Sequence, residues 1–338
     1  MKVAFILPMI TNCGPVNVVL NLCKEYEAVG VKTKIIYLRE SCDNNYLEVF
    51  LSLNSLGVYK YENENIEYIL EEIDVLHSHG YYPDKISRKL KTKAKKISTI
   101  HCMFFKDYIK EYGVVKGFLG SISHFMTLKY GGFHKIVGCS KSVSDYILSW
   151  IPTLINVRFI NNGVDQNIFY PLKIEDKINR INEMSLHKFN KIFIYSGRVI
   201  RRKRVPELIS IFNQHYSGDN ALIILGDGEE LEICKKLSNK NVLFMGAVSN
   251  PSYYYQIADY VISNSSAEGY PMSIIEAVSC GCKGLLSDIP PHSEFINSNP
   301  DLADYIYNAD KFKIKNIYEV DSLSSKQMAL KYLKIYES

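Results

Sequence analysis

Short runs rich in valine and isoleucine recur along the chain, and longer segments of helical spacing separate them. Most of these runs end in glycine, serine or asparagine before the next helical segment. Buried strands that alternate with helices are typical of parallel sheets covered on both faces. The pattern therefore predicts two doubly wound, Rossmann-like α/β domains. We expect strands at 2–8, 32–38, 74–80, 95–101, 135–140 and 157–163, and then at 191–197, 221–228, 241–248, 259–265 and 281–288.

A polar segment without a strong apolar stripe separates the two halves. It begins after a proline-marked turn, and we interpret residues 171–190 as a linker between domains at 1–170 and 191–320. The last residues, 321–338, carry apolar side chains at broadly helical spacing and are predicted to form a helix near the interdomain crossover. An ordinary terminal helix explains that spacing equally well.

The composition is that of an ordinary folded protein. Of 338 residues, 47% are hydrophobic and 22% are charged, and no apolar run approaches the roughly 20 residues that cross a bilayer. The first apolar run is too short for a signal peptide, because a polar turn with Gly14 follows it. Eight cysteines without a Cys-x-x-Cys pair indicate reduced thiols and no zinc site. We therefore expect a soluble, cytoplasmic protein.

The net charge of +4 is too small to indicate a nucleic-acid partner by itself. The basic residues are unevenly spread, however, because seven of them fall within residues 85–96. A solvated helix face explains this cluster, and so does a patch that faces anionic lipid or an anionic acceptor. Both interpretations stay open here.

The segment SNSSAEGYPMSIIEAVSCG, residues 263–281, holds two glutamates on either side of Gly-Tyr-Pro. A strand ends at its start, Gly269 permits a turn, and Pro271 suits the entry of the helix that follows. Together with the helix dipole, free amides at a helix start form a site for phosphate. The amides expected there belong to Met272, Ser273 and Ile274.

Glu268 and Glu276 would repel a phosphate unless they bind something neutral. Sugar hydroxyls meet this need, because a carboxylate accepts two hydrogen bonds from a vicinal diol. We therefore expect both glutamates to hold hydroxyls and not a metal ion. For Glu276 the alternative is a capping box with Ser273. For Glu268 the alternative is a solvated loop acid.

A second candidate binding segment, YSGRVIRRKR at residues 195–204, also follows the end of a predicted strand. Arg198 can hold phosphate oxygens through its guanidinium fork, and Lys203 supplies a point charge five residues later. The two cations could neutralise a departing diphosphate without magnesium. A basic surface turn is the alternative.

These residues resemble the signature of the retaining GT-B glycosyltransferases of family 4. The resemblance rests on Gly197-Arg198 with Lys203, and on Glu268-Gly-Tyr-Pro with Glu276. It extends to the segment NNGVDQNIFYP at 161–171, to the strand end STIHC and to the loop ILGDGEE, and it covers most of the chain up to about Ile296.

The resemblance implies a role for each matched residue. Glu276 should accept the ribose hydroxyls of a nucleotide sugar, and Glu268 should contact the transferred sugar. Arg198 and Lys203 should bind the diphosphate, and His101 should lie near the reacting sugar, although a histidine at a strand end is often merely packed. Backbone contacts are implied for Gly14 with the diphosphate, for Gly246, Ala247 and Val248 with the base, and for Gly269, Tyr270, Pro271, Met272, Ser273 and Ile274 with the donor.

Three positions depart from the family pattern. The usual glycine-glycine entrance is NCGPVN here, the glycine after Lys203 is Arg204, and the phenylalanine of Glu-Gly-Phe-Pro is Tyr270. The first departure bears on the contact expected from Gly14.

The resemblance implies a GT-B glycosyltransferase with an N-terminal acceptor-binding domain and a C-terminal nucleotide-sugar-binding domain. We expect a metal-independent hexosyltransferase that needs no cofactor and retains the anomeric configuration. A UDP-sugar is the favoured donor, with GDP-mannose as the alternative, and the acceptor is a glycan or a lipid-linked hydroxyl in bacterial surface polysaccharide synthesis, such as capsule or lipopolysaccharide. A catalytically silent GT-B subunit and a nucleotide-sugar epimerase are rival hypotheses.

Residues 114–130 carry an apolar stripe beside lysines. Core burial explains such a stripe, and contact with membrane or a lipid-linked glycan is the alternative. With the basic cluster at 85–96, the stripe suggests peripheral contact with the anionic inner face of the cytoplasmic membrane. Its apolar residues are Val114, Phe118, Ile122, Phe125 and Leu128.

Overall fold

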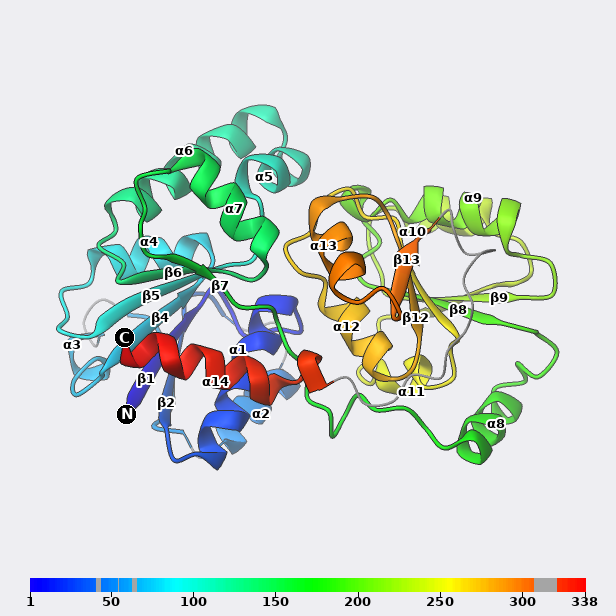
Figure 1. Ribbon diagram of the computed structural model, residues 1–338, viewed down its shortest axis with the longest axis horizontal. Helices are drawn as coiled ribbons and strands as arrows, with labels where there is room; N and C mark the ends of the chain where they lie inside the picture. The colour runs from blue at the N-terminus through cyan, green and yellow to red at the C-terminus, as the bar shows by residue number, and fades with distance from the viewer. Residues whose placement is uncertain (41–43, 54, 63–65, 307–320) are drawn as a thin grey trace. The chain divides into compact units, whose positions relative to one another are not determined.

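The computed structural model divides the chain into two compact units, each built around one parallel sheet (Figure 1). The first unit comprises Met1–Gly163 and Ser322–Ser338, and the second comprises Val164–Asp321. The predicted α/β fold class is confirmed. The residues that the structure describes are 1–40, 44–53, 55–62, 66–306 and 321–338.

The division of the chain differs in detail from the predicted boundaries. The chain leaves the first unit after Gly163, and the predicted boundary at residue 320 lies outside the described residues. The segment interpreted as a linker contains helix α8 (Ile174–Glu183). Lys177 Nζ lies 3.6 Å from Asp259 Oδ1, and α8 therefore packs within the second unit.

The first sheet has seven parallel strands in the order β3-β2-β1-β4-β5-β6-β7. β1 is an inner strand, and its Phe5 pairs with Ile35 of β2 on one side and with His77 of β4 on the other. All six strands predicted in this half are present, and β3 is an additional edge strand. The strands are β1 (Lys2–Leu7), β2 (Lys32–Tyr37), β3 (Val58–Lys60), β4 (Val75–His79), β5 (Lys95–Ile100), β6 (Lys135–Gly138) and β7 (Val157–Phe159).

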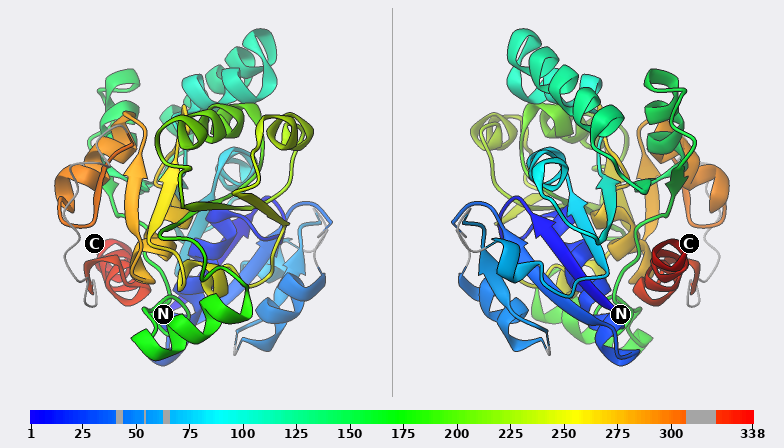
Figure 2. Two further views of the ribbon diagram at one scale, coloured as in Figure 1. Left: turned by 90° about the vertical axis from the view of Figure 1, so that its right-hand side faces the viewer. Right: turned by 90° about the vertical axis from the view of Figure 1, so that its left-hand side faces the viewer.

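Helices cover both faces of this sheet (Figures 1 and 2). One core cluster joins strand residues Ala4, Ile6, Ile36 and Leu76 to the apolar side of the segment around Ile69. The helices of the unit are α1 (Gly14–Ala28), α2 (Asn44–Ser52), α3 (Ile66–Ile69), α4 (Tyr81–Lys89), α5 (Phe104–Tyr112), α6 (Val114–Tyr130), α7 (Lys141–Trp150) and the C-terminal α14 (Ser325–Glu337).

Helix α14 is anchored to the first unit, where it lies beside α1 (Figure 1). Ser325 Oγ donates to Glu25 Oε1 at 2.5 Å. At the other end of the helix, the Tyr336 hydroxyl lies 2.6 Å from His77 Nδ1, on the central strands. The helix thus completes the core of the N-terminal unit, although it comes from the opposite end of the chain.

The second sheet has six parallel strands in the order β10-β9-β8-β11-β12-β13. All five strands predicted in this half are present, and β13 is an additional edge strand. The strands are β8 (Ile192–Ser196), β9 (Ala221–Leu225), β10 (Val242–Gly246), β11 (Tyr260–Ser263), β12 (Lys283–Leu286) and β13 (Ala303–Tyr305).

Aromatic rings form the centre of the second unit's core. The Phe193 ring stacks on Tyr260 at 4.9 Å and meets Phe212 edge-on at 5.6 Å. Apolar side chains of the strands fill the remaining space against the covering helices. Besides α8, the helical segments are the 3-10 turn η1 (Arg201–Lys203), α9 (Val205–His215), α10 (Leu231–Leu237), α11 (Ser252–Tyr255), α12 (Met272–Ser279) and α13 (Pro290–Ser298).

Candidate active site

The strands of the second sheet are parallel, so their carboxyl ends lie along one edge. After β8 the chain builds β9 and β10 on one side, and then β11 to β13 on the other side. Ligands of open α/β sheets bind outside the strand ends at such a switch point. Arg198 follows β8 and Glu268 follows β11. The two predicted binding segments, residues 195–204 and 263–281, therefore flank the switch point.

Lys203 and Glu268 form a buried ion pair at this edge. The Lys203 ammonium contacts Glu268 Oε1, and Arg202 Nη1 lies 3.6 Å from Oε2. The three side chains are only 10–15% exposed. A carboxylate taken out of water needs such compensation, because an unpaired buried charge is strongly destabilising.

The two cations set the protonation state of Glu268. Burial alone would raise the pKa of this carboxyl group, but Lys203 and then Arg202 outweigh burial and hold the pKa at about 2. Glu268 is therefore ionised at every physiological pH. The alternative of a solvated loop acid is wrong, since Glu268 is buried.

Arg202 also fixes the loop that carries Glu268. Its Nη1 donates to the Ala267 carbonyl at 2.7 Å. Its own carbonyl accepts from the Ser266 amide at 2.9 Å and from the Ser266 hydroxyl at 3.0 Å. The turn after β8 and the loop after β11 are thus held together by backbone contacts as well as by charge. The sequence analysis did not single out Arg202.

Arg204 explains one departure from the family pattern. It adopts the left-handed conformation, with φ 52° and ψ 45°, between η1 and α9. Glycine reaches this conformation without a Cβ clash, which is why glycine suits the position. Arg204 adopts this conformation at some cost in strain.

Arg198 stands at the exposed start of this turn. Its carbonyl accepts from the Tyr195 hydroxyl at 2.8 Å, so the backbone at Arg198 is fixed to the strand that precedes it. A glycine in the neighbouring loop makes room for the turn. A Cβ on Gly226, whose φ is +137°, would lie 1.9 Å from the Gly197 oxygen.

Helix α12 begins at Met272, with Pro271 at the N-cap position. Met272 and Ser273 occupy the first helical positions, whose N–H groups lack intrahelical partners. The Ile274 amide, however, donates to the Pro271 carbonyl at 3.2 Å. The prediction of a free amide at Ile274 is therefore wrong, because the first turn closes on itself. The predicted phosphate site at this helix start rests on Met272 and Ser273.

Glu276 is buried on the second turn of α12. Its Oε2 accepts from the Tyr255 hydroxyl at 3.4 Å, and that hydroxyl is within hydrogen-bonding reach of Ser196 at the end of β8. Burial raises the pKa of Glu276 to about 7, and the Tyr255 hydroxyl opposes this rise only in part. The capping-box alternative does not hold, because Pro271 and not Ser273 is the N-cap residue.

Two aromatic neighbours complete the surroundings of Glu268. The Tyr270 ring packs edge-on against Phe295 of α13 at 6.1 Å, so Tyr270 is a buried packing residue. His292 of α13 is fully buried and interacts electrostatically with Glu268. Burial lowers the pKa of His292 to about 4, and it is therefore neutral. Sequence analysis missed His292, although it follows the end of β12.

The edge predicted to bind the base lies at the end of β10. The strand has an irregular register between Phe244 and Gly246, and the Gly246 carbonyl accepts from the Gly226 amide at 2.7 Å. Ala247 is exposed and Val248 is half-buried. A backbone edge of this kind offers hydrogen-bonding groups without a charged side chain.

The remaining predicted residues, Gly14 and His101, belong to the first unit. Gly14 opens α1, and His101 follows β5. His101 Nε2 lies 3.0 Å from Nδ1 of His79, which ends β4. Burial lowers the pKa of His101 to about 4, so this half-buried imidazole is neutral. The pairing with His79 is a feature that sequence analysis missed.

Within the described part of the chain, no group of three or more histidine, cysteine, aspartate or glutamate side chains has the arrangement of a metal site. At the switch point, Arg198, Arg202 and Lys203 carry three positive charges and Glu268 carries one negative charge, so the net charge of these four side chains is +2.

Two doubly wound α/β units and a cation-rich switch point in the second unit define a GT-B protein. Residues 13–167 match the sequence model of Glycosyltransferase Family 4, and residues 176–310 match that of Glycosyl transferases group 1. Together the two matches span most of the chain, which therefore belongs to the group 1 glycosyltransferases.

Individual relatives agree with this assignment. The O-antigen biosynthesis glycosyltransferase WclY of Escherichia coli is 26% identical over an alignment of 363 residues, which covers 100% of this chain and 98% of WclY. The capsular polysaccharide biosynthesis glycosyltransferase CapH of Staphylococcus aureus is also 26% identical, over 63% of this chain and 65% of CapH. Among solved structures, Anabaena Alr3699/HepE in complex with UDP-glucose has a TM-score of 0.73 at 13% identity, covering 100% of this chain and 97% of that chain.

Proposed function

We propose that this glycosyltransferase moves a sugar from a nucleoside-diphosphate donor to an acceptor hydroxyl, with retention of the anomeric configuration. The observation that carries the proposal is the buried Lys203–Glu268–Arg202 cluster beside Arg198 at the switch point. A binding module has no need to collect this charge at a strand edge. A reaction that releases a diphosphate does.

In this proposal the cations act on the leaving group. Arg198 and Lys203 hold the diphosphate oxygens, and the net charge of +2 that Arg198, Arg202, Lys203 and Glu268 carry together offsets the charge that develops as the glycosidic bond breaks. Arg202 stays with Glu268, so that this buried carboxylate keeps a partner when Lys203 turns to the diphosphate. Because these side chains supply the charge, the proposed reaction needs no metal ion or other cofactor.

The two glutamates hold hydroxyl groups. Glu276 accepts the ribose hydroxyls in its ionised form, and Glu268 orients the transferred sugar with help from the amides of Met272 and Ser273. A diphosphate oxygen of the leaving group takes the proton of the acceptor hydroxyl, so no enzymic nucleophile is required. The neutral His101 donates or accepts one hydrogen bond near the sugar, and Gly14 offers its amide to the diphosphate.

Known proteins support the choice of donor and acceptor. Alr3699/HepE was solved with UDP-glucose, which favours a UDP-sugar donor here over GDP-mannose. WclY and CapH are named for O-antigen and capsular polysaccharide biosynthesis. We infer a glycan or lipid-linked acceptor in bacterial surface polysaccharide synthesis, at the cytoplasmic side of the membrane.

Acceptor-dependent release of nucleoside diphosphate tests the proposed activity. A panel of nucleotide sugars is first screened by thermal shift, and the stabilising donor is then incubated with and without candidate lipid-linked acceptors. Diphosphate release only with acceptor, and a product with the anomeric configuration of the donor by NMR, are the expected results. A changed sugar without transfer would instead identify an epimerase. Binding of a sugar without turnover would identify a silent subunit.

A further inference from the structure

Helix α6 is packed with its polar side inward. Its buried residues are Gly117, Ser121, His124, Thr127 and Leu128, and only the last has a large apolar side chain. Core burial, one of the two interpretations of the sequence stripe, does not hold for Val114, Phe118 and Ile122, because all three are exposed. The exposed apolar residues of α6 are Val114, Val115, Phe118, Leu119, Ile122, Met126 and Tyr130, and five of them recur at every fourth position along the whole helix.

Buried polar contacts fix this orientation of α6. His124 Nε2 lies 3.0 Å from Asp84 Oδ2, and His124 Nδ1 lies 3.0 Å from the Tyr108 hydroxyl. Ser121 Oγ donates to the Phe104 carbonyl at 3.0 Å. Rolling the helix to bury its apolar side would break these bonds and leave the Asp84 carboxylate without its histidine partner.

Close backbone packing gives a second reason for the orientation. A Cβ on Gly117 would lie 2.5 Å from the Ile109 Cα, so only glycine lets α6 approach α5 this closely. The apolar surface therefore faces outward because of the way the two helices pack.

Aromatic residues of neighbouring helices extend the apolar surface. Phe105 of α5 lies 5.9 Å from the Phe118 ring and stacks on Trp150 of α7 at 4.2 Å. Trp150 is 46% exposed and Tyr112 is 58% exposed. We call this surface, formed by Tyr112, Trp150 and the exposed apolar residues of α6, the α6 surface.

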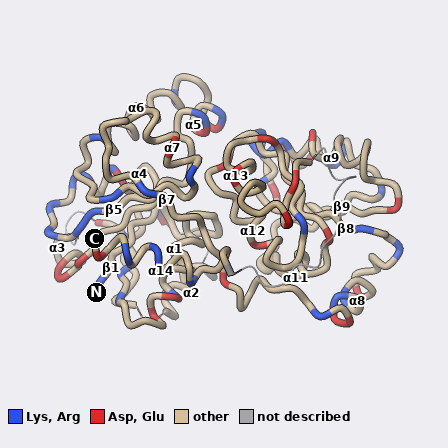
Figure 3. Tube along the Cα trace, viewed as in Figure 1, with Lys and Arg blue, Asp and Glu red and all other residues tan. Residues whose placement is uncertain are grey.

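The charges around the α6 surface are mainly positive. Helix α6 contains Lys116 and Lys129 and no acidic residue, and α5 adds Lys106 and Lys110 (Figure 3). Of the two acids in α5, Asp107 is buried and accepts from the Met103 amide at 2.8 Å. Glu111 is thus the single exposed acid among residues 104–130, all of which the structure describes.

We propose that the α6 surface docks on a bilayer that contains anionic phospholipid, with α6 lying along the interface. Apolar side chains on one face of a helix bury themselves at the boundary between headgroups and acyl chains, and lysines beside them reach lipid phosphates. Within the described residues no helix has the length and apolar character needed to cross a bilayer. A second copy is a poorer occupant, because it would place these lysines against their own counterparts.

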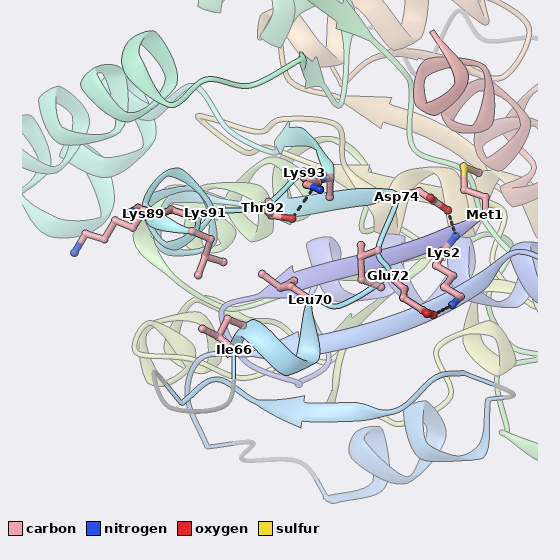
Figure 4. A pocket seen from close by; sticks show the side chains of 13 residues that line it. Met1, Lys2, Ile66, Leu70, Glu72, Asp74, Lys89, Lys91, Thr92 and Lys93 are labelled. Atoms are coloured by element: carbon pink, nitrogen blue, oxygen red, sulfur yellow. Dashed lines mark hydrogen bonds and ion pairs between the residues drawn. The ribbon is translucent and has the colours of Figure 1, made fainter.

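The basic cluster at 85–96 is the weaker of the two predicted membrane contacts. Lys95 Nζ donates to the Tyr336 carbonyl at 3.1 Å and Lys96 Nζ donates to the Leu90 carbonyl at 2.8 Å, so both stabilise the fold. Several of the others border a hollow of about 1280 Å³ near the start of β1 (Figure 4). That hollow also contains two acids, Glu72 and Asp74, which bind the ammonium and the amide of Lys2.

Vesicle co-sedimentation of the full chain tests this proposal independently of catalysis. Vesicles of phosphatidylcholine alone are compared with vesicles that also contain about 30% phosphatidylglycerol. The wild-type chain should bind the anionic vesicles and lose affinity in high salt. The Phe118→Ser/Leu119→Ser variant should bind them at least about tenfold more weakly, because two inserted apolar side chains are lost.

A matched variant controls for the loss of exposed apolar side chains in general. Ile233→Ser/Leu237→Ser changes two residues of α10 that are 50% and 45% exposed, and should bind vesicles like the wild type. All three proteins should show the same melting temperature and the same stabilisation by UDP. Absence of wild-type binding, equal binding by the α6 variant, or a dimer that the α6 variant dissociates would each overturn the proposal.

Discussion

The Lys203 ammonium and the Glu268 carboxylate, 65 residues apart in the chain, form a buried ion pair that Arg202 shares. The pair joins the turn after β8 to the loop after β11. Both residues therefore serve the fold as well as the proposed reaction. In the proposed reaction, Lys203 exchanges Glu268 for the diphosphate while Arg202 remains beside the carboxylate.

Replacing Lys203 by alanine should impair both turnover and stability. Loss of one preorganised charge contact lowers turnover by about a hundredfold or more. The free energy of unfolding of the variant should also be lower by about 1–3 kcal/mol, because Glu268 keeps only Arg202 as a partner. Steady-state kinetics and urea unfolding measure the two effects, and Lys235→Ala on the exposed face of α10 is the control. Unchanged turnover by the alanine variant would contradict the assignment of Lys203.

Arg202 is predicted to act by positioning Glu268. Arg202→Met removes one of the two cations that hold the Glu268 pKa near 2, so this pKa should rise toward the ordinary glutamate value of 4.5. The acid limb of the profile of kcat/KM against pH should then move to higher pH, and Arg202→Lys should move it back in part. A purely structural role would lower stability without shifting the limb.

The ionisation of Glu276 should control donor affinity. Burial places its pKa at about 7 in the free protein, and the proposed ribose contact uses the ionised form. The KM for the donor should therefore rise as pH falls below about 7, while kcat changes less. Titration calorimetry with UDP in buffers of different ionisation enthalpy should also detect proton release on binding near neutral pH. Binding of UDP that is independent of pH from 5 to 8 would contradict this role.

Glu276→Gln separates function from stability. The folded-state pKa of about 7 lies above the ordinary glutamate value of 4.5, so the stability contributed by Glu276 is full below pH 4.5 and is lost as pH rises through 7. The glutamine variant should therefore be more stable than the wild type at pH 8, by up to about 3 kcal/mol, and show little gain at pH 4. It should bind UDP weakly at all pH values. Equal melting temperatures at pH 8 would show that Glu276 is not buried as described.

Arg204→Gly should stabilise the protein without changing the reaction. The left-handed φ of 52° strains an arginine more than a glycine, and its contact with Glu207 lies on the surface. Allowing for the greater freedom of glycine in the unfolded chain, we expect a gain of about 0.5–1 kcal/mol. Thermal unfolding measures the gain, and Arg201→Gly, which has no such backbone strain, should lose stability instead.

The sequence predicted the sheets well because their central strands are continuous apolar runs that end in small or polar residues. β3 and β13 escaped prediction because each is a three-residue edge strand, VYK and ADY, without an apolar run. Helix α8 was read as a linker because none of its residues is buried. It attaches to the second unit through Lys177 and Arg180, which no hydrophobic pattern reveals.

The site was only partly accessible to prediction. Strand ends and local motifs pointed to Arg198, Lys203, Glu268 and Glu276. The spacing of residues in the sequence, however, cannot show that the side chains of Lys203 and Glu268 are in contact. His292 and Arg202 were missed because their importance comes from what they contact across the fold. The sequence left core burial and membrane contact both open for the stripe of α6, because an apolar stripe indicates a buried face only when the opposite face has no better partner.

A crystal structure of the chain with UDP or a UDP-sugar would show directly whether Lys203 leaves Glu268 to bind the diphosphate. We expect diphosphate oxygens within hydrogen-bonding distance of Arg198 and Lys203, ribose hydroxyls on Glu276, and Glu268 still held by Arg202. A nucleotide bound elsewhere, or one bound at this edge with Lys203 still paired to Glu268 and away from the phosphates, would contradict it.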